Sequence, residues 1–458
     1  MIVVHHMDKW AYCNLDLIEE VLEKEKKAVV LIAGASSSGK SYCADYLTTM
    51  LESNNHHAVT ISLDQYNIGL SGIIPNKVNL NYFHNSLDNM GAIRGRIKEI
   101  INDVPFDKKY SPAVLQKIQK ALKDTISSEE MPVFLRGLKE EWARLNFDET
   151  TVYDLKEATD DIKKLMQNKT IEAKEYSKII SERVPSGKVI DGKDYDCIIV
   201  EGIYALDRSV LEAFRGRKYV IKSFVAGNAK SLFLRRIIRD SKISSASNAF
   251  TTKLYFTSIL KSYQETIFPS RLESDVLLYN DMTFSEIRNG DLYTTKEEIQ
   301  IVDERKAKRL IKESEIESLS YQKDTYFTCQ GEREDSQDSN VLRLRSLSYD
   351  EGKTYIPSSL VHKGKSKVRR DGKIIRPINI IVREGEFYDV WKDESACLKD
   401  FLSAGFYIGP VRYKRKYRLD YRGQKLVLNW IQGEKTILEI NRPYHKEVLD
   451  ELRKKLKG

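Results

Sequence analysis

The chain has 458 residues, of which 41% are hydrophobic and 31% are charged, and its formal net charge is +8. This length exceeds what one ordinary hydrophobic core organises, so two or three domains are expected. No run of about 18 apolar residues occurs, which argues against a membrane helix, and the N-terminus does not read as a secretory signal. Five scattered cysteines without a C-x-x-C pair exclude a disulfide or zinc framework and favour a cytoplasmic protein.

Positive charge is concentrated at the end of the sequence. Residues 341–458 contain 27 Lys and Arg against 15 Asp and Glu, a net of +12, so the remainder carries −4. An anionic ligand is therefore expected in the last quarter of the chain, either nucleic acid or a polyphosphate or nucleotide. Nucleic acid is disfavoured because the charges alternate along strands and are not grouped with stacking aromatics on an open platform.

The first part of the chain alternates apolar runs with helical patterns, which predicts an α/β fold with a parallel sheet. A helix is expected over residues 231–240, and a helical insertion over about 68–145. Strands are expected at residues 28–33, 58–63, 195–201, 219–225 and 276–279.

Residues 34–41 read GASSSGKS and fit the pattern G-x-x-x-x-G-K-[ST] in full. The loop is expected to join a buried strand to a helix N-terminus, where free N–H groups and the helix dipole favour phosphate. In such a loop Lys40 reaches the β and γ phosphates and the Ser41 hydroxyl ligates Mg²⁺. The alternative is a Ser/Gly-rich turn that only resembles the motif. We predict that ATP or GTP binds at Gly34, Ala35, Ser36, Ser37, Ser38, Gly39, Lys40 and Ser41.

Two carboxylates and three arginines have positions suited to phosphoryl transfer. Glu201 ends an apolar strand, the usual place of the Mg²⁺-holding carboxylate in a P-loop enzyme. Asp64 follows the strand after the loop and can accept the proton of an attacking hydroxyl; its alternative role is a helix N-cap. The arginines can clamp the transferring phosphate or lie on a solvated helix face: Arg235, Arg236 and Arg239.

Several segments together resemble the uridine kinase/phosphoribulokinase branch of P-loop kinases, across most of residues 28–280. The resemblance implies transfer of the γ-phosphoryl of a nucleotide to a hydroxyl of a nucleoside or a phosphorylated small molecule. It also implies that Asp64 is the base and that the three arginines form part of a lid. The matching segments are residues 34–41, 62–66 (SLDQY), 146–149 (NFDE), 198–206 (IIVEGIYAL) and 234–240 (LRRIIRD).

Three departures from that family concern the acceptor. Glu149 and Thr150 replace the His-Pro that helps uridine kinases to hold the pyrimidine. Residues 241–245 (SKISS) replace the Arg-Gly-Arg of the family's lid, and the stretch between Asp64 and Asn146 is unusually long. Nucleotide binding survives these changes, but specificity for uridine does not follow.

Two domains are expected, the first over residues 1–288 and the second over residues 289–458. The second domain is expected to contain a charged helix over residues 303–319. Arg343 and Arg345 lie on one face of an expected strand. Like charges on a strand face repel unless water or an anion lies against them, so each basic strand is either a solvated outer face or part of an anion site. Three basic strands favour a common site. The basic residues with shared parity are Lys363, Lys365, Lys367 and Arg369, and also Arg412, Lys414, Lys416 and Arg418.

Residues 295–445 resemble the CYTH, or triphosphate tunnel, family. The resemblance implies an antiparallel barrel with a basic interior that binds triphosphates, here through Arg343, Arg345, Lys363, Lys365 and Lys414, with acidic residues holding the metal. The family's paired metal carboxylates are reduced to Glu298 and Glu439, while Glu384 and Glu386 are expected to share a face of another strand. The matching segments are residues 322–327 (QKDTYF), 342–345 (LRLR), 362–365 (HKGK), 403–406 (SAGF), 411–417 (VRYKRKY) and 438–440 (LEI).

Three activities remain open from the sequence. The leading interpretation is a Mg²⁺-dependent kinase of the uridine kinase type with a polyphosphate- or nucleotide-binding barrel. The second is a pyrophosphate or triphosphate hydrolase, because fusions of these two domain types include pyrophosphatases. The third is a barrel that only senses nucleotides. The phosphoryl acceptor is undetermined, and a homo-oligomer is one option for the assembly.

Overall fold

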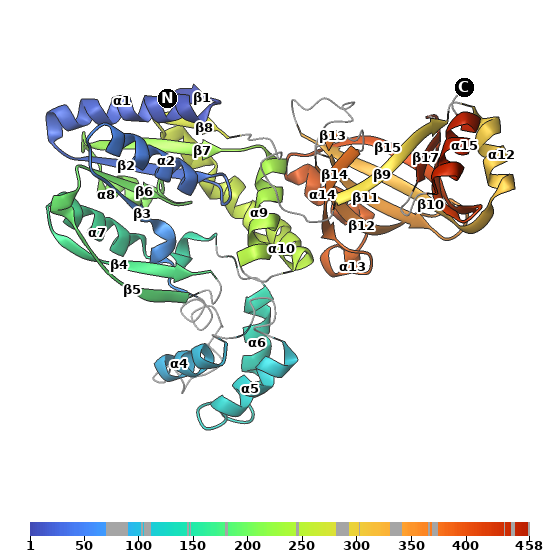
Figure 1. The fold of residues 1–458 in the computed structure, drawn as a ribbon. Coiled ribbons are helices and arrows are strands. Elements are labelled where there is room, and N and C mark those ends of the chain that lie inside the picture. Colours follow the sequence, from blue (N-terminus) through green and yellow to red (C-terminus); the bar gives the residue numbers. More distant parts are fainter. Residues whose placement is uncertain are drawn as a thin grey trace. The chain divides into compact units, whose positions relative to one another are not determined.

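The computed structural model divides the chain into two compact units, Met1–Asp281 and Met282–Gly458 (Figure 1). Each unit has its own sheet. The structure describes residues 1–69, 90–101, 104, 111–143, 146, 148–178, 182–243, 247–280, 293–301, 303–329, 341–364, 367–368, 374–434, 436–440 and 445–456.

The first unit contains a six-stranded sheet with the strand order β1-β8-β7-β2-β6-β3. All its pairings are parallel, as the alternation of apolar runs and helices predicts. Helices cover both faces, which is why the central strands are continuous apolar runs. The strands are β1 Ile2–Val4, β2 Ala28–Gly34, β3 Ala58–Ser62, β6 Cys197–Glu201, β7 Val220–Ala226 and β8 Val276–Tyr279.

Successive residues of β2 alternate between two cores. Val30 and Ile32 pack with Trp10 of α1 and Leu47 of α2, while Leu31 packs on the other face with α7 and α8. Figure 1 shows α1 and α2 on the opposite side of the sheet from α7. The α-helices of this sandwich are α1 Met7–Glu25, α2 Lys40–Ser53, α7 Leu155–Met166, α8 Arg208–Ala213, α9 Ala229–Ile243, α10 Asn248–Leu254 and α11 Leu260–Ser262.

Short helical turns of other types complete this part of the unit. Two π-helical turns flank α11, and 3₁₀ turns follow β3, precede α7 and β6, and precede β8. They are the π turns Tyr255–Ile259 and Tyr263–Ile267, and the 3₁₀ turns Leu63–Tyr66, Thr150–Val152, Gly192–Asp194 and Pro269–Glu273.

The first unit contains two further parts outside this sheet. The predicted helical insertion contains α4 Met90–Ile101, α5 Pro112–Leu122 and α6 Met131–Ala143, which share a small apolar cluster. An antiparallel hairpin of β4 Thr170–Ser177 and β5 Glu182–Asp191 precedes β6. This hairpin was not predicted from the sequence.

The second unit is a nine-stranded, antiparallel sheet with the order β12-β11-β10-β15-β16-β17-β9-β14-β13. In addition, β12 is hydrogen-bonded to β14 as well as to β11. The strands are β9 Tyr293–Ile301, β10 Glu315–Thr328, β11 Val341–Ser348, β12 Ile356–Lys363, β13 Lys367–Val368, β14 Ile374–Val382, β15 Tyr407–Tyr421, β16 Gln424–Ile431 and β17 Thr436–Ile440.

Helices pack on this sheet at two places. Leu310 and Leu452 pack against apolar residues of β15, β16 and β17, and Phe401 stacks on Phe327 of β10 with ring centroids 4.2 Å apart. The helices are α12 Glu304–Glu313, α13 Phe387–Val390, α14 Glu394–Ser403 and α15 Lys446–Leu456.

Two expectations for this unit were wrong. The charged helix expected over 303–319 ends at Glu313, and Glu315 already begins β10. Glu384 and Glu386 do not share a strand face, because β14 ends at Val382; Glu386 instead accepts a hydrogen bond from the Arg383 backbone in the turn before α13. In the part of the chain that the structure describes, no helix combines the length and apolarity that crossing a bilayer requires.

Candidate functional site

The phosphate loop leaves β2 and enters α2 at Lys40, as its strand-loop-helix context predicts. Its two glycines are required by the backbone. Gly34 has a φ of +151° and a Cβ there would lie 2.2 Å from the carbonyl oxygen of Val225. Gly39 has a φ of +101°, and its Cβ would lie 2.6 Å from Asn280 Nδ2. A side chain at either position would therefore deform the loop.

The loop presents polar groups that the protein itself does not satisfy. Ser37 Oγ and Ser38 Oγ are buried and have no hydrogen-bond partner among the described residues. Lys40 is 7% exposed and donates to the backbone carbonyl of Ala35 at 2.8 Å. Burial lowers the pKa of Lys40, although Glu201 and Asp64 oppose that shift. Buried donors of this kind fit an incoming phosphate.

The two predicted carboxylates line the same cavity of about 400 Å³ as Lys40 and Ser41. Glu201 is 6% exposed and lies at the end of β6, paired in register with Ile32 of β2 and Ser62 of β3. Mg²⁺ prefers oxygen ligands such as carboxylates and hydroxyls, so the Glu201 carboxylate and the Ser41 hydroxyl fit this metal.

Asp64 lies in a 3₁₀ turn directly after β3. It is not the N-cap of that turn: Ser62 is, and Ser62 Oγ accepts from the Asp64 backbone N–H. Asp64 Oδ2 is 3.0 Å from Nζ of Lys178, which follows β4 of the unpredicted hairpin. Burial would raise the pKa of Asp64, but Lys178, Lys40 and Arg239 outweigh it and lower that pKa. The carboxylate is thus held ionised while its side chain remains 36% exposed.

The three predicted arginines of α9 have different surroundings. Arg235 Nη1 lies 3.4 Å from the Ser38 carbonyl and Arg239 Nη1 donates to Ser36 Oγ at 3.1 Å, so both contact the phosphate loop. Arg236 is buried and forms ion pairs with Asp148 at 3.1 Å and Asp240 at 2.8 Å. Burial opposes the charge of Arg236, but both carboxylates outweigh it and raise its pKa. None of the three lies on a solvated helix face.

Several cavity residues were not predicted as site residues. Most of them come from the hairpin, from the loop before α7 and from α10, elements that no motif marks, while Tyr42, Asn67 and Ile203 lie within or beside the motif segments. Asp148 and Asp240 were quoted only within the matching segments, and no role was assigned to them. The unpredicted lining residues are Tyr42, Asn67, Tyr153, Tyr176, Lys178, Ile203, Phe250, Thr251 and Leu254.

The predicted cations of the second unit converge on one carboxylate that was not predicted to bind them. Asp324 of β10 is fully buried. Its oxygens lie 2.8 Å from Arg345 Nε, 2.6 Å from Lys414 Nζ and 3.4 Å from Arg343 Nη1. Burial would raise the pKa of Asp324, but these cations hold it far below its usual range. The anion that lies against these basic strands is therefore a side chain of the protein itself, the Asp324 carboxylate.

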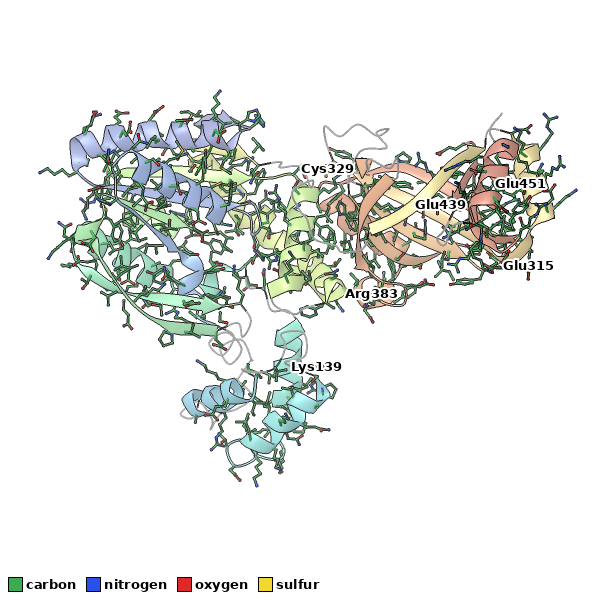
Figure 2. The ribbon with its side chains drawn as sticks, viewed as in Figure 1. Lys139, Glu315, Cys329, Arg383, Glu439 and Glu451 are labelled. Carbon is green, nitrogen blue, oxygen red and sulfur yellow. The ribbon has the colours of Figure 1, made fainter. Side chains whose placement is uncertain are left out.

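The remaining predicted residues of this unit are placed only in part. Lys363 ends β12, while Lys365 and the side chain of Glu298 lie outside the described residues. Glu439 lies on β17, where Figure 2 labels it, and pairs in register with Glu298 of β9. Burial would lower the pKa of Arg345, but the hydrogen bonds and charge of Asp324, with a smaller effect of Glu439, raise that pKa.

These features define the first unit as an α/β P-loop fold with a kinase-like cavity. No family model matches the chain. A uridine kinase of Macrococcus caseolyticus is 29% identical over 139 residues, which make up 30% of this chain and 65% of that protein. A uridine kinase of Staphylococcus aureus is 28% identical over 133 residues, 29% of this chain and 61% of that protein. The chain is thus homologous to uridine kinases over less than two thirds of their length.

Solved structures show weaker similarity. A protein described as a possible uridine kinase from Bacillus stearothermophilus is 13% identical, with a TM-score of 0.28 over 58% of this chain and 98% of that chain. The Hippeastrum protein HpAC1, described as having a dominant triphosphatase activity, is 12% identical, with a TM-score of 0.24 over 35% of this chain and 87% of that chain. Both TM-scores lie below 0.5.

Proposed function

We propose that the chain is a Mg²⁺-dependent cytoplasmic phosphotransferase of the uridine kinase type. It transfers the γ-phosphoryl of ATP or GTP to a hydroxyl of a nucleoside or a phosphorylated small molecule. The observation that carries this proposal is the convergence of Lys40, Asp64 and Glu201 with the arginines of α9 around one cavity.

The residues divide the work as follows in this proposal. Lys40 and the loop N–H groups hold the β and γ phosphates, and Arg235 and Arg239 stabilise charge on the phosphoryl group in transit. Ser41 and Glu201 would hold the Mg²⁺, which neutralises phosphate charge. Asp64 Oδ2 accepts the proton of the acceptor hydroxyl as that oxygen forms its bond to phosphorus and the ADP oxygen leaves.

A screen of the purified protein tests this function. It is incubated with Mg²⁺-ATP and, in turn, with nucleosides, sugar phosphates, pyrophosphate and tripolyphosphate, and ADP and orthophosphate are measured separately. ADP that forms only with an acceptor, without orthophosphate, supports the kinase. Orthophosphate released from pyrophosphate or tripolyphosphate without an acceptor would select the hydrolase instead.

For residues 289–458 we propose a CYTH-like domain that binds polyphosphate or nucleotide. Two observations favour it. The pairings of β12 with both β11 and β14 support closure of the sheet into a barrel, and the charged residues around Asp324 would then face its interior. Glu439 pairs in register with Glu298, so two acidic residues stand opposite each other on neighbouring strands, and a bound cation would stabilise such a pair. Whether this domain hydrolyses its ligand or only senses it is decided by the orthophosphate measurement.

A further inference from the structure

Asp324 is the centre of the charged cluster in the second unit. It is paired in register with Arg345 of β11 on one side and with Arg412 of β15 on the other. Arg345 donates to both of its oxygens, from Nε at 2.8 Å and from Nη2 at 2.9 Å, and Lys414 donates to Oδ2 at 2.6 Å. The carboxylate therefore already occupies much of the cations' donor capacity.

The carboxylate does not neutralise the cluster. Asp324, together with Glu439, whose charge also acts on Arg345, carries two negative charges against the three positive charges of Arg343, Arg345 and Lys414. The Arg343 side chain is 7% exposed, and its Nε has no hydrogen-bond partner among the described residues. A buried guanidinium N–H without an acceptor is costly, so the cluster retains both charge and a donor for a second anion.

We propose that Asp324 is a resident counter-anion that makes this cluster select long anions over short ones. The proposal rests on the polyphosphate site proposed above and adds the residue that sets its specificity. An orthophosphate near Arg345 must compete with the carboxylate for the same N–H groups and is repelled by its charge at close range.

A linear polyphosphate escapes most of that penalty. Its outer phosphoryl groups reach cations further along the same strand face, since Lys416 and Arg418 have the parity of Lys414 on β15. Each additional contact offsets repulsion that acts mainly on the group nearest Asp324. The carboxylate thus weakens binding of every anion, but it weakens binding of a single phosphate most.

The test compares tripolyphosphate with orthophosphate by calorimetry on the full chain. All variants carry Lys40→Ala, which weakens anion binding at the phosphate loop. We expect tripolyphosphate to bind at least about 100-fold more tightly than orthophosphate when Asp324 is present. Asp324→Asn should strengthen binding of both and reduce that ratio at least tenfold. The double variant Arg343→Ala/Arg345→Ala should remove the binding, which would show that the measured binding heat comes from this cluster.

A matched control separates local from general charge effects. Glu394 pairs with Lys323 at 2.9 Å, and Lys323 has the opposite parity to Asp324 on β10. Glu394→Gln removes the same charge from the same unit and should leave the ratio unchanged. An equal fall in the ratio in this control would overturn the proposal, as would an unchanged ratio in Asp324→Asn.

Folding of the variant is controlled separately. If Asp324→Asn loses its cooperative thermal transition, the double variant Asp324→Asn/Lys414→Met removes one charge of each sign and is compared with Lys414→Met alone. The ratio must again fall. If the parent protein binds neither anion, the anion site itself is wrong; if it binds tripolyphosphate with a ratio insensitive to Asp324, only the role of Asp324 is wrong.

Discussion

At the residue scale, Lys40 carries the first prediction. Lys40→Ala should lower the rate of acceptor-dependent ADP formation by at least about 100-fold, because phosphoryl transfer depends mainly on positioning and charge stabilisation. The rate is measured at saturating Mg²⁺-ATP, and circular dichroism checks that the fold persists. The exposed Lys169 provides the control: Lys169→Ala should keep the parent rate. Unchanged turnover in Lys40→Ala would contradict the kinase assignment.

A second residue-scale prediction concerns Lys178. Its ion pair with Asp64 helps to lower the pKa of that carboxyl. Without the ammonium, the pKa of Asp64 rises, so the carboxylate is protonated at a higher pH. Lys178→Met should therefore shift the acid limb of the pH–rate profile upwards, while Lys178→Arg should restore it.

Asp64 itself provides the control for that shift. Asp64→Asn should retain Mg²⁺-ATP affinity but lose transfer, and no acid limb should remain to be moved by Lys178→Met. A variant that loses ATP binding but keeps its rate per bound complex would show that Asp64 is a structural or metal residue and not the base.

The sequence predicts residues of a contiguous motif better than residues that meet across the fold. Lys40 and Glu201 could be assigned because a loop pattern and a strand end fix their positions. Lys178 could not, since its contact with Asp64 depends on a hairpin that joins segments 114 residues apart in the chain. Asp324 was missed for a related reason: alternation identifies the cations of β11 and β15, but not the carboxylate that satisfies them.

At the element scale, a hydrophobic period of two or of 3.6 residues predicts whether a segment is a strand or a helix, but not the residues at which it begins and ends. The charged pattern at 303–319 continues past the helix because Glu315 and Glu317 begin an exposed strand end, whose polarity resembles that of a surface helix. Parallel strands were predicted best, since burial on both faces makes them continuously apolar. The pairing of β12 with β14 depends on long-range contacts, which no periodicity of the sequence indicates.

The packing of α15 on the second sheet gives an element-scale prediction. Leu452 is fully buried among residues of α12, β16 and β17. Leu452→Ala should lower the free energy of unfolding of this unit by about 2–5 kcal/mol, through lost apolar burial and a residual cavity. Leu402 of α14 is 49% exposed, so Leu402→Ala should change the free energy of unfolding by less than about 1 kcal/mol. Urea unfolding compares the two, and similar losses would contradict the packing of α15.

At the scale of the whole molecule, the two clusters of charge share no residue. Among the residues that the structure describes, those lining the cavity around Lys40 belong to Met1–Asp281, and the groups paired with Asp324 belong to Met282–Gly458. Each unit also has its own apolar cores. Two separable activities are therefore expected.

Paired variants test that separation. Lys40→Ala should lower acceptor-dependent ADP formation by at least about 100-fold and leave tripolyphosphate binding by the second unit within about twofold. Arg343→Ala with Arg345→Ala should instead remove tripolyphosphate binding and leave ADP formation within about twofold. The binding that survives in Lys40→Ala should weaken with added salt, but less steeply than binding by exposed lysines, because buried charges are screened less. Loss of both activities in either variant, with the fold intact by circular dichroism, would show that the two clusters act on one ligand.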